Sequence, residues 1–345
     1  METVIMNRDQ RPRAIVKRAQ WVLVCLGLLC GQAGHAGTFP APEGADSVFG
    51  ALSIATTTHG DTLLDIARAY DQGYREMKIA NPEVDVLLPG HDTEVLIPSL
   101  FIRPDALHGG RPGIVVNVAE LRLYHQYKGE DGTLKIDTFP ISIGRQEWET
   151  PHGRATKVVA KVKDPSWYPP ESVRKEHEEW GDPLPRVVPP GDDNPLGKHA
   201  LRLGLPGYLI HGTNRPYGIG MRVTHGCLRM YPKDVEQMYA LTSVGTEVQI
   251  VNEPFKVGRR GDELYLEAHP SLEGDSDATE LTLSGVVDRI AMVMDGAQIA
   301  INWSHLKATV ARRSGIPTLI GTVRAEGEAL AAPQRTQVSE LAPSG

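Results

Sequence analysis

Several runs between positions 112 and 251 have an apolar residue at every second position, which is the period of a β-strand with one buried face. The clearest run is Ile114, Val116 and Val118, and a turn at 119–120 joins it to a second alternating run at 121–125, as in a β-hairpin. The chain also contains 35 glycines and 26 prolines, which favour turns and interrupt helices. We therefore expect 112–251 to be a mainly β domain, sandwich- or barrel-like, with one or two short helices.

Shorter patterns indicate the other elements of this domain. Strands are predicted at 134–143, 157–162, 208–210 and 247–251, and a helix that begins with a proline is predicted at 232–239. The segment 164–199 is long and rich in Pro and Gly, and loops of this length are usually functional or disordered. We expect it to be ordered, because Trp167 and Trp180 both need packing partners.

Length and charge narrow the class of protein. A chain of 345 residues has room for about two or three domains. Its formal net charge is −7, and it has no basic stripe with interleaved aromatic residues, so nucleic acid is not an expected partner.

The N-terminus has the parts of a cleavable export signal. Basic residues between positions 8 and 18 precede ten apolar residues at 21–30, and Gly34 and Ala36 supply small residues before a cleavage point. A transmembrane helix needs about 20 apolar residues. We therefore expect a signal peptide at 1–36 that is removed and leaves no stable membrane anchor; a short retained anchor is the alternative.

Removal of residues 1–36 leaves one cysteine in the chain. Of the three cysteines, Cys25 and Cys30 lie in the apolar part of the signal, and Cys227 is the third. No disulfide within the mature chain is then possible. A free thiol in an exported protein is exposed to oxidation, so its presence asks for a functional reason.

The segments outside the central domain have weaker sequence patterns. Residues 37–52 are small and polar and indicate a linker, and 326–345 have the composition of a disordered tail. Residues 252–325 are predicted to form a small α+β C-terminal subdomain with amphipathic helices near 281–293 and 304–313.

Residues 53–98 are predicted to form a small β-α-α-β module. Asp61 is a plausible N-cap, apolar residues follow at helical spacing, and Asn81-Pro82 ends a second helix. The segment resembles the LysM module on Gly60-Asp61-Thr62-Leu63, Ile66-Ala67, Asn81-Pro82, Leu88-Pro89-Gly90 and Ile97-Pro98. That resemblance implies binding to the glycan of peptidoglycan; a packing domain without a ligand is the alternative.

The loop that starts at His211 and ends at Arg229 concentrates reactive groups. It holds Cys227 and two histidines, each followed by glycine, and a thiol with a nearby imidazole is the usual arrangement of a cysteine nucleophile and its base. His225 lies two residues before Cys227, whereas His211 ends the strand predicted at 208–210. We favour His211 as acid/base, oriented by the carbonyl of Gly212.

Two further roles are predicted in the same loop. Gly226 allows backbone N–H groups to approach a developing oxyanion, and Arg229 has the bidentate geometry that binds a carboxylate. Other interpretations stay open: an isolated cysteine is often a small buried apolar residue, and His211, His225 and Cys227 are possible zinc ligands, although the paired spacing common in zinc sites is absent.

The loop resembles the signature of the L,D-transpeptidase (YkuD-type) catalytic domain. The matching residues are Thr224-His225-Gly226-Cys227-Leu228-Arg229 with His211-Gly212 upstream, and the similarity extends over 112–251. Many relatives have Asn where this chain has Arg229, which matches a periplasmic branch with an N-terminal LysM module. The resemblance implies that Cys227 is the nucleophile, that His211 is its acid/base partner and that His225 assists; Thr224 and Arg229 are assigned to substrate binding.

The resemblance also implies an activity and a location. The family cleaves the bond between meso-diaminopimelate and D-alanine of a tetrapeptide stem through a thioester, without metal or other cofactor, in the periplasm. The acyl acceptor is expected to be the C-terminal lysine of an outer-membrane lipoprotein. Direct diaminopimelate–diaminopimelate cross-linking is the alternative, and a non-catalytic peptidoglycan-binding protein is a second one.

Overall fold

In the computed structural model of the protein, residues 37–272, 282–294 and 297–323 are described. The predicted signal peptide (1–36) and tail (326–345) lie outside these residues. Strands account for 33% of the structure and helices for 24%, so the predicted mainly β class is confirmed. Within the described ranges, no helix combines the length and the apolar character needed to cross a bilayer.

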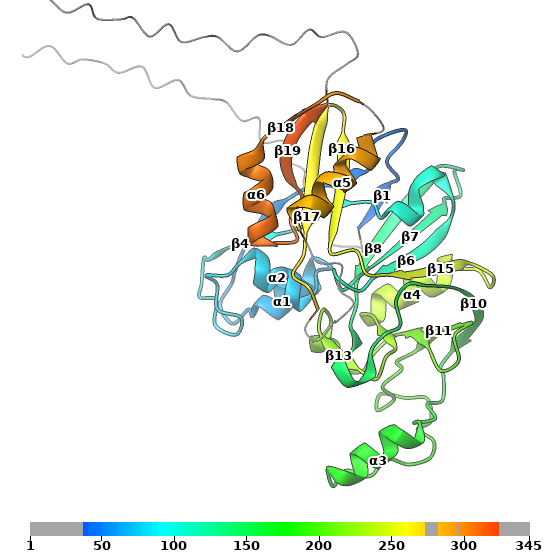
Figure 1. The fold of residues 1–345 in the computed structure, drawn as a ribbon. Coiled ribbons are helices and arrows are strands. Elements are labelled where there is room, and N and C mark those ends of the chain that lie inside the picture. The colour runs from blue at the N-terminus through cyan, green and yellow to red at the C-terminus, as the bar shows by residue number, and fades with distance from the viewer. Residues whose placement is uncertain (1–36, 273–281, 295–296, 324–345) are drawn as a thin grey trace, which may run out of the picture. The chain divides into compact units, whose positions relative to one another are not determined.

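A nine-stranded sheet, curved as a half-barrel, is built mainly from strands of residues 112–251 (Figure 1). Its strands in spatial order are β1 (Thr38–Pro40), β8 (Leu134–Pro140), β7 (Arg122–Lys128), β6 (Gly113–Asn117), β15 (Glu247–Val251), β10 (Arg154–Lys163), β11 (His199–Leu203), β12 (Leu209–His211) and β14 (Leu228–Arg229). Neighbours are antiparallel except for two parallel pairs, β6 with β15 and β12 with β14. The predicted hairpin is confirmed as β6–β7, with Leu121 at φ 60° in its turn.

Both faces of the β6–β7 hairpin are buried, whereas the sequence pattern predicted one. Ile114 and Leu123 belong to the main core of the sheet, and α4 (Pro232–Leu241) adds Val235 and Met238 to that core. On the opposite face, Val115 and Tyr124 are also at most 1% exposed. They pack in a second core with aromatic residues from outside 112–251, Phe49 and Phe101.

Residues 37–52 are not the linker that was predicted. β1 pairs with β8 and extends the main sheet, and β2 (Val48–Gly50) pairs with β5 (Leu100–Ile102). Phe39 and Phe49 contact each other edge to face, with ring centroids 5.3 Å apart. The segment is structured because it covers the second face of the hairpin, which small and polar composition alone does not reveal.

The predicted β-α-α-β order is present in β3 (Ser53–Thr56), α1 (Leu63–Ala69), α2 (Tyr74–Ala80) and β4 (Glu94–Ile97). β3 and β4 pair antiparallel, and the module has its own small core. The predicted N-cap is wrong by one residue. Thr62 caps α1 in a capping box with Asp65, whereas Asp61 accepts hydrogen bonds from Thr58 in the preceding turn.

Arg122 of β7 fastens this module to the main sheet. Its side chain is 1% exposed, and its guanidinium donates to both carboxylate oxygens of Glu76, at 2.6 and 2.9 Å. It also donates to the carbonyl of Asp71 and the side-chain oxygen of Gln72. A buried charge with this many partners requires a defined orientation of α2 against β7.

The C-terminal residues form the predicted α+β subdomain. Its sheet has the order β16 (Phe255–Arg260), β17 (Glu263–Ala268), β19 (Thr318–Val323), β18 (Ile299–Ile301). The helices α5 (Leu283–Met294) and α6 (Trp303–Arg312) fall within one or two residues of their predicted positions and pack on this sheet through Val286, Ile290 and Leu306.

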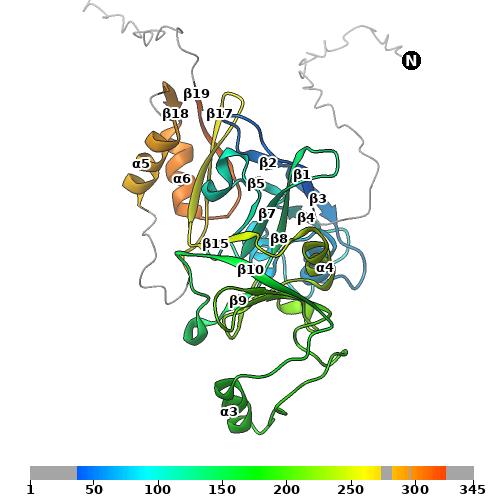
Figure 2. The ribbon, with the colours of Figure 1, turned by 90° about the vertical axis from the view of Figure 1, so that its right-hand side faces the viewer.

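The long segment 164–199 contains one helix, α3 (Glu171–Glu179), joined to the sheet by extended connections (Figure 1, Figure 2). The segment is ordered as predicted, but the reason given for Trp180 is wrong. That side chain is 60% exposed and contacts His177 and the guanidinium of Arg145 rather than a core.

Candidate active site

The parallel pairing of β12 with β14 brings the two ends of the reactive loop together. His211 is the register partner of Arg229, and Ile210 that of Leu228. Register partners in a parallel pair point to the same face, and so does the residue two positions earlier in an extended strand. The pairing therefore places His211, Arg229 and Cys227 on one side of this sheet edge, although His211 and Cys227 are far apart in sequence.

Cys227 is half-buried, and its thiol is protonated at neutral pH. The Sγ atom lies 3.5 Å from the carbonyl oxygen of Gly207. Burial raises the pKa of the thiol above its usual value, and a backbone contact at Leu209 and the charge of Arg229 oppose this only in part. A nucleophilic thiolate must therefore be formed during the reaction by a base.

His211 is a buried imidazole on the strand that pairs with β14. Its ring is 4% exposed, and Nδ1 lies 2.7 Å from the carbonyl oxygen of Gly212, which confirms the predicted contact. The carbonyl can only accept, so Nδ1 carries the proton and Nε2 keeps its lone pair. Burial, assisted by the charge of Arg229, lowers the pKa of His211 to about 3. The resting site is thus a neutral thiol with a neutral imidazole.

His225 has quite different surroundings. Its Nε2 lies 2.6 Å from the carboxylate of Glu176, which projects from α3, and its ring meets the edge of Trp148 at a centroid distance of 5.4 Å. Arg145 forms an ion pair with the same carboxylate. The hydrogen bond from His225, followed by the contacts of Arg145, lowers the pKa of Glu176. His225 therefore joins the reactive loop to the long segment 164–199.

Thr224 and Gly226 shape the loop. Thr224 is 2% exposed; its hydroxyl donates to the carbonyl of Cys227 at 2.7 Å and accepts the N–H of Gly226 at 3.2 Å. The N–H of Gly226 is thus engaged within the loop, while the substrate contact of Thr224 and the approach of neighbouring N–H groups to an oxyanion stay predictions. Gly226 adopts φ 101°, and a Cβ there would lie 3.0 Å from the ring of Tyr208, so glycine is required for conformation.

Gly212 serves the site through its carbonyl. Its carbonyl accepts from His211, and its N–H donates to the carbonyl of His199 at 3.2 Å. An added Cβ would lie 3.1 Å from the side chain of Val235, so little space exists for a larger residue.

Arg229 supplies positive charge beside the thiol. Its Nε is buried and has no hydrogen-bond partner among the described residues, while its backbone pairs with Ser142. Burial, followed by the charge of the exposed Arg215, lowers the pKa of Arg229, so two guanidinium groups lie close together. A substrate carboxylate is the group that this arrangement would stabilise.

Comparison with known proteins identifies the family. The sequence profile of the L,D-transpeptidase catalytic domain (YkuD) matches residues 111–250. The chain is 36% identical over 291 residues to the probable L,D-transpeptidase ErfK/SrfK of Escherichia coli K12, an alignment that covers 83% of this chain and 91% of that protein. The chain belongs to the L,D-transpeptidase family. To the probable L,D-transpeptidase YbiS of the same organism it is 37% identical over 289 residues, 81% of this chain and 90% of the relative.

Solved structures of L,D-transpeptidases are more distant. An L,D-transpeptidase from Mycobacterium tuberculosis H37Rv is 20% identical, with a TM-score of 0.29 and coverage of 44% of this chain and 60% of that one. The catalytic domain of the Enterococcus faecium L,D-transpeptidase is also 20% identical, with a TM-score of 0.30 and coverage of 41% and 98%.

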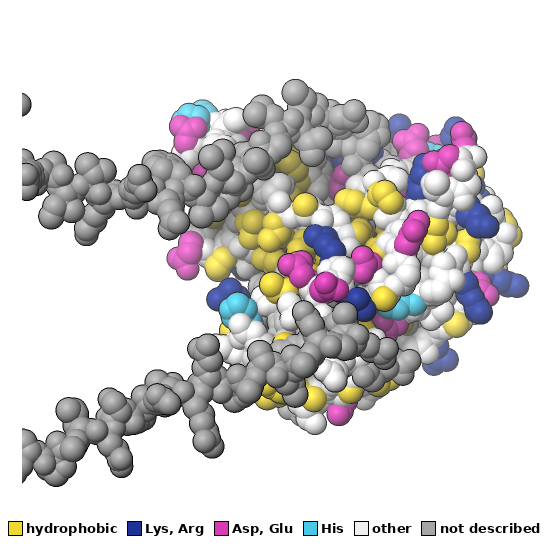
Figure 3. All heavy atoms as spheres, turned by 90° about the horizontal axis from the view of Figure 1, so that it is seen from above, with side chains coloured by type: hydrophobic (Ala, Val, Ile, Leu, Met, Phe, Trp, Pro, Cys, Tyr) yellow, Lys and Arg dark blue, Asp and Glu magenta, His cyan; other side chains and the backbone are white. Residues whose placement is uncertain are grey.

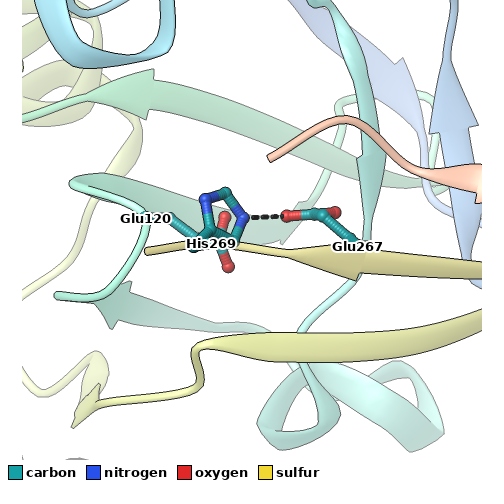
Figure 4. A group of neighbouring side chains, drawn as sticks. All are labelled: Glu120, Glu267 and His269. Carbon is teal, nitrogen blue, oxygen red and sulfur yellow. Dashed lines mark hydrogen bonds and ion pairs between the residues drawn. The ribbon is translucent and has the colours of Figure 1, made fainter. Parts of the chain in front are cut away.

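A second cluster of ionisable groups in this L,D-transpeptidase lies away from the thiol. Among the described residues, Glu120, Glu267 and His269 are the one group whose ligand atoms converge as a metal site requires, and His211, His225 and Cys227 do not converge in this way (Figure 4). The ammonium of Lys256 already lies 2.8 Å from Glu120 and 3.0 Å from Glu267. Because Lys256 supplies the cation, we interpret the cluster as structural, joining the C-terminal sheet to the turn after β6.

Sequence reasoning missed the residues that surround His225. Glu176, Arg145 and Trp148 come from three separate segments that only the fold brings together. The charged sequence of 171–179 predicts an exposed helix, and nothing in it marks Glu176 as the partner of a loop histidine. Arg215 was likewise missed, although it lies inside the loop between His211 and Arg229.

Proposed function

We propose that this L,D-transpeptidase uses Cys227 to cleave the meso-diaminopimelate–D-alanine bond of a peptidoglycan tetrapeptide stem and to transfer the acyl group to an amine. The observation that carries the proposal is His211, a buried and neutral imidazole with a free Nε2, on the strand beside Cys227. A thiol whose pKa is raised by burial needs a base to become nucleophilic, and the strand that pairs with β14 supplies this imidazole lone pair.

The acylation step follows from these groups. As Sγ of Cys227 bonds to the carbonyl carbon, Nε2 of His211 accepts the thiol proton, and negative charge develops on the carbonyl oxygen. The backbone N–H of Cys227 is the proposed donor to that oxyanion. The C–N bond then breaks, and His211 returns the proton to the departing amine of D-alanine, which leaves a thioester on Cys227.

The second half of the reaction reverses these roles. An acceptor amine attacks the thioester carbonyl and gives a proton to Nε2 of His211. The C–S bond breaks, His211 protonates the departing thiolate, and an amide replaces the thioester. We propose that Arg229, with Arg215 near it, holds a substrate carboxylate during both halves.

The other parts of the chain are proposed to bring the reaction to its polymer. Residues 53–98, as a LysM-like module, would hold the glycan and raise the local concentration of stems. Residues 164–199 would limit access of water, which competes with the acceptor amine. We further propose export to the periplasm through the signal peptide and a lipoprotein lysine as acceptor, with direct diaminopimelate cross-linking as the alternative.

Mass spectrometry of the protein with a purified disaccharide tetrapeptide tests the chemistry. The expected result is an adduct on Cys227 with stoichiometric release of D-alanine, absent in Cys227→Ala. Activity should withstand EDTA and be abolished by iodoacetamide. A folded, reduced protein that releases no D-alanine would instead be the non-catalytic binding protein, and loss with EDTA alone would favour the zinc interpretation.

A gene deletion separates the two acceptors. If the lipoprotein is the acceptor, the deletion removes lipoprotein-linked muropeptides and leaves diaminopimelate–diaminopimelate dimers in place. The opposite pattern would replace lipoprotein anchoring by direct cross-linking.

A further inference from the structure

A large cleft that is not lined by Cys227 lies where three segments meet. It has a volume of about 1190 Å³ and is lined by α2, by residues 220–222 and by the C-terminal end of α6 with the residues that follow. Ligand sites for small molecules are usually about 300–1,000 Å³. This cleft therefore has room for a segment of polymer rather than only a small molecule.

The charge of the cleft is one-sided. Among the described residues that line it, no side chain is acidic and five are cationic: Arg75, Lys78, Arg222, Arg312 and Arg313. The chain as a whole carries −7, so this sign is opposite to that of the protein. The face seen in Figure 3 looks different, because positive and negative side chains are mixed there with hydrophobic ones.

Internal contacts leave part of this charge available. Lys78 and Arg312 are exposed and form no ion pair within the described part of the chain. Arg313 caps α6 at φ 50°, a left-handed conformation that is uncommon outside glycine, and its Nε donates only to the carbonyl of Val310. Arg75 donates to the carbonyl of Pro270 and Arg222 forms an ion pair with Glu149, so the available charge is that of Lys78, Arg312 and Arg313. The C-terminal ends of α2 and α6 contribute about half a negative charge each, which offsets part of these three charges.

The cleft also leads towards the reactive loop. Arg222 begins β13 (Arg222–Thr224), which pairs with β9 (Ile143–Gly144), and the chain continues from β13 directly to His225 and Cys227. At about 3.3 Å per residue, the five steps from Arg222 to Cys227 span at most roughly 16 Å. A polymer held in the cleft would therefore pass within reach of the thiol.

We propose that this cleft binds carboxylate-bearing stem peptides of the peptidoglycan strand that neighbour the stem that reacts at Cys227. The apolar lining of Ile79, Pro82 and Val84 suits the aliphatic parts of such stems, and the cations Lys78, Arg312 and Arg313 suit their carboxylates. The proposal rests on the proposed function, since it names how the same enzyme holds its polymer.

Binding measurements on the full mature chain carrying Cys227→Ala test the cleft without turnover. The probes are an uncross-linked glycan oligomer of four disaccharide tetrapeptides and the same glycan after an amidase has removed its stems. The triple change Lys78→Gln, Arg312→Gln and Arg313→Gln is expected to raise the Kd for the stem-bearing oligomer about 10-fold or more at moderate salt. The Kd for stem-free glycan should not change.

Matched controls separate local charge from total charge and from folding. Arg111→Gln, Lys128→Gln and Lys307→Gln remove three exposed cations that do not line the cleft, and they should leave both Kd values unchanged. The triple change Lys78→Arg, Arg312→Lys and Arg313→Lys keeps all three charges. Its Kd for the stem-bearing oligomer should therefore lie close to that of the parent chain. An equal loss in both triple glutamine variants, or no loss in the cleft variant, would overturn the proposal.

A turnover assay keeps the cleft distinct from the chemistry. With Cys227 present, the cleft variant should release D-alanine from a single disaccharide tetrapeptide at the wild-type rate; failure of the wild type in that assay would count against the proposed function instead.

Discussion

The two histidines of the reactive loop have different surroundings, one buried and one polar, although each precedes a glycine and each is near Cys227. His211 is 4% exposed, hydrogen-bonded to a backbone carbonyl, and has its pKa lowered to about 3. His225 is half-buried and contacts a charged network, Glu176 and Arg145, on a segment that projects from the sheet. A fixed neutral imidazole suits proton transfer, whereas a charge-dependent contact between two loops suits positioning. The difference predicts unequal effects when each is removed.

The largest effect is expected for Cys227→Ala, because both histidines act through this thiol. Removal of a catalytic nucleophile typically costs about 10⁶-fold in kcat. D-Alanine release from a tetrapeptide stem should therefore fall to background, with the Tm unchanged within about 2 °C since the side chain is small. Measurable turnover by this variant would show that another group is the nucleophile.

The next effect is expected for His211→Ala. Loss of a general base costs about 10²- to 10⁴-fold, and single-turnover formation of the Cys227 thioester is the step to measure. Added imidazole should partly restore the rate, because the cavity left by the ring is close to the thiol. A variant that retains more than a tenth of the wild-type rate would remove the distinction between the two histidines.

Smaller effects are expected on the His225 side. His225→Ala and Glu176→Gln should each reduce acylation about 3- to 10-fold, and the double variant should be little worse than either single one, since the two residues form one contact. Asp182→Asn, on an exposed carboxylate of the same segment, is the matched control and should have no effect. Fully additive losses in the double variant would show that Glu176 and His225 act independently.

The sequence predicts the His211 side better than the His225 side, for a physical reason. The strand at 208–210, the turn after it and the reactive loop are local patterns, and the parallel pairing of β12 with β14 needs only one long-range contact. Glu176 reaches His225 across 49 positions from a segment whose polar sequence fits any exposed helix. The roles of Thr224 and Gly226 also depend on hydrogen bonds that composition does not specify.

The same reasoning explains the outcome for the fold. Period-two and helical patterns locate β15, α4, α5 and α6 within two residues, because each buries one regular face. Residues 37–52 lack such a pattern, and their strands exist only because the hairpin of β6 and β7 needs a cover on its second face. Burial by a distant segment is a property of the whole chain, so the local sequence pattern predicts a linker at 37–52.

The pH dependence of acylation tests the central claim most directly, that His211 is the neutral base of this site. With a pKa of about 3, His211 is protonated in only about 1% of molecules at pH 5, whereas an ordinary histidine would be protonated in about 97%. Single-turnover thioester formation should therefore show no histidine-dependent fall between pH 7 and pH 5, in the wild type and in His225→Ala alike, with circular dichroism to verify folding. A fall with a midpoint near pH 6.5 that persists in His225→Ala would contradict the account.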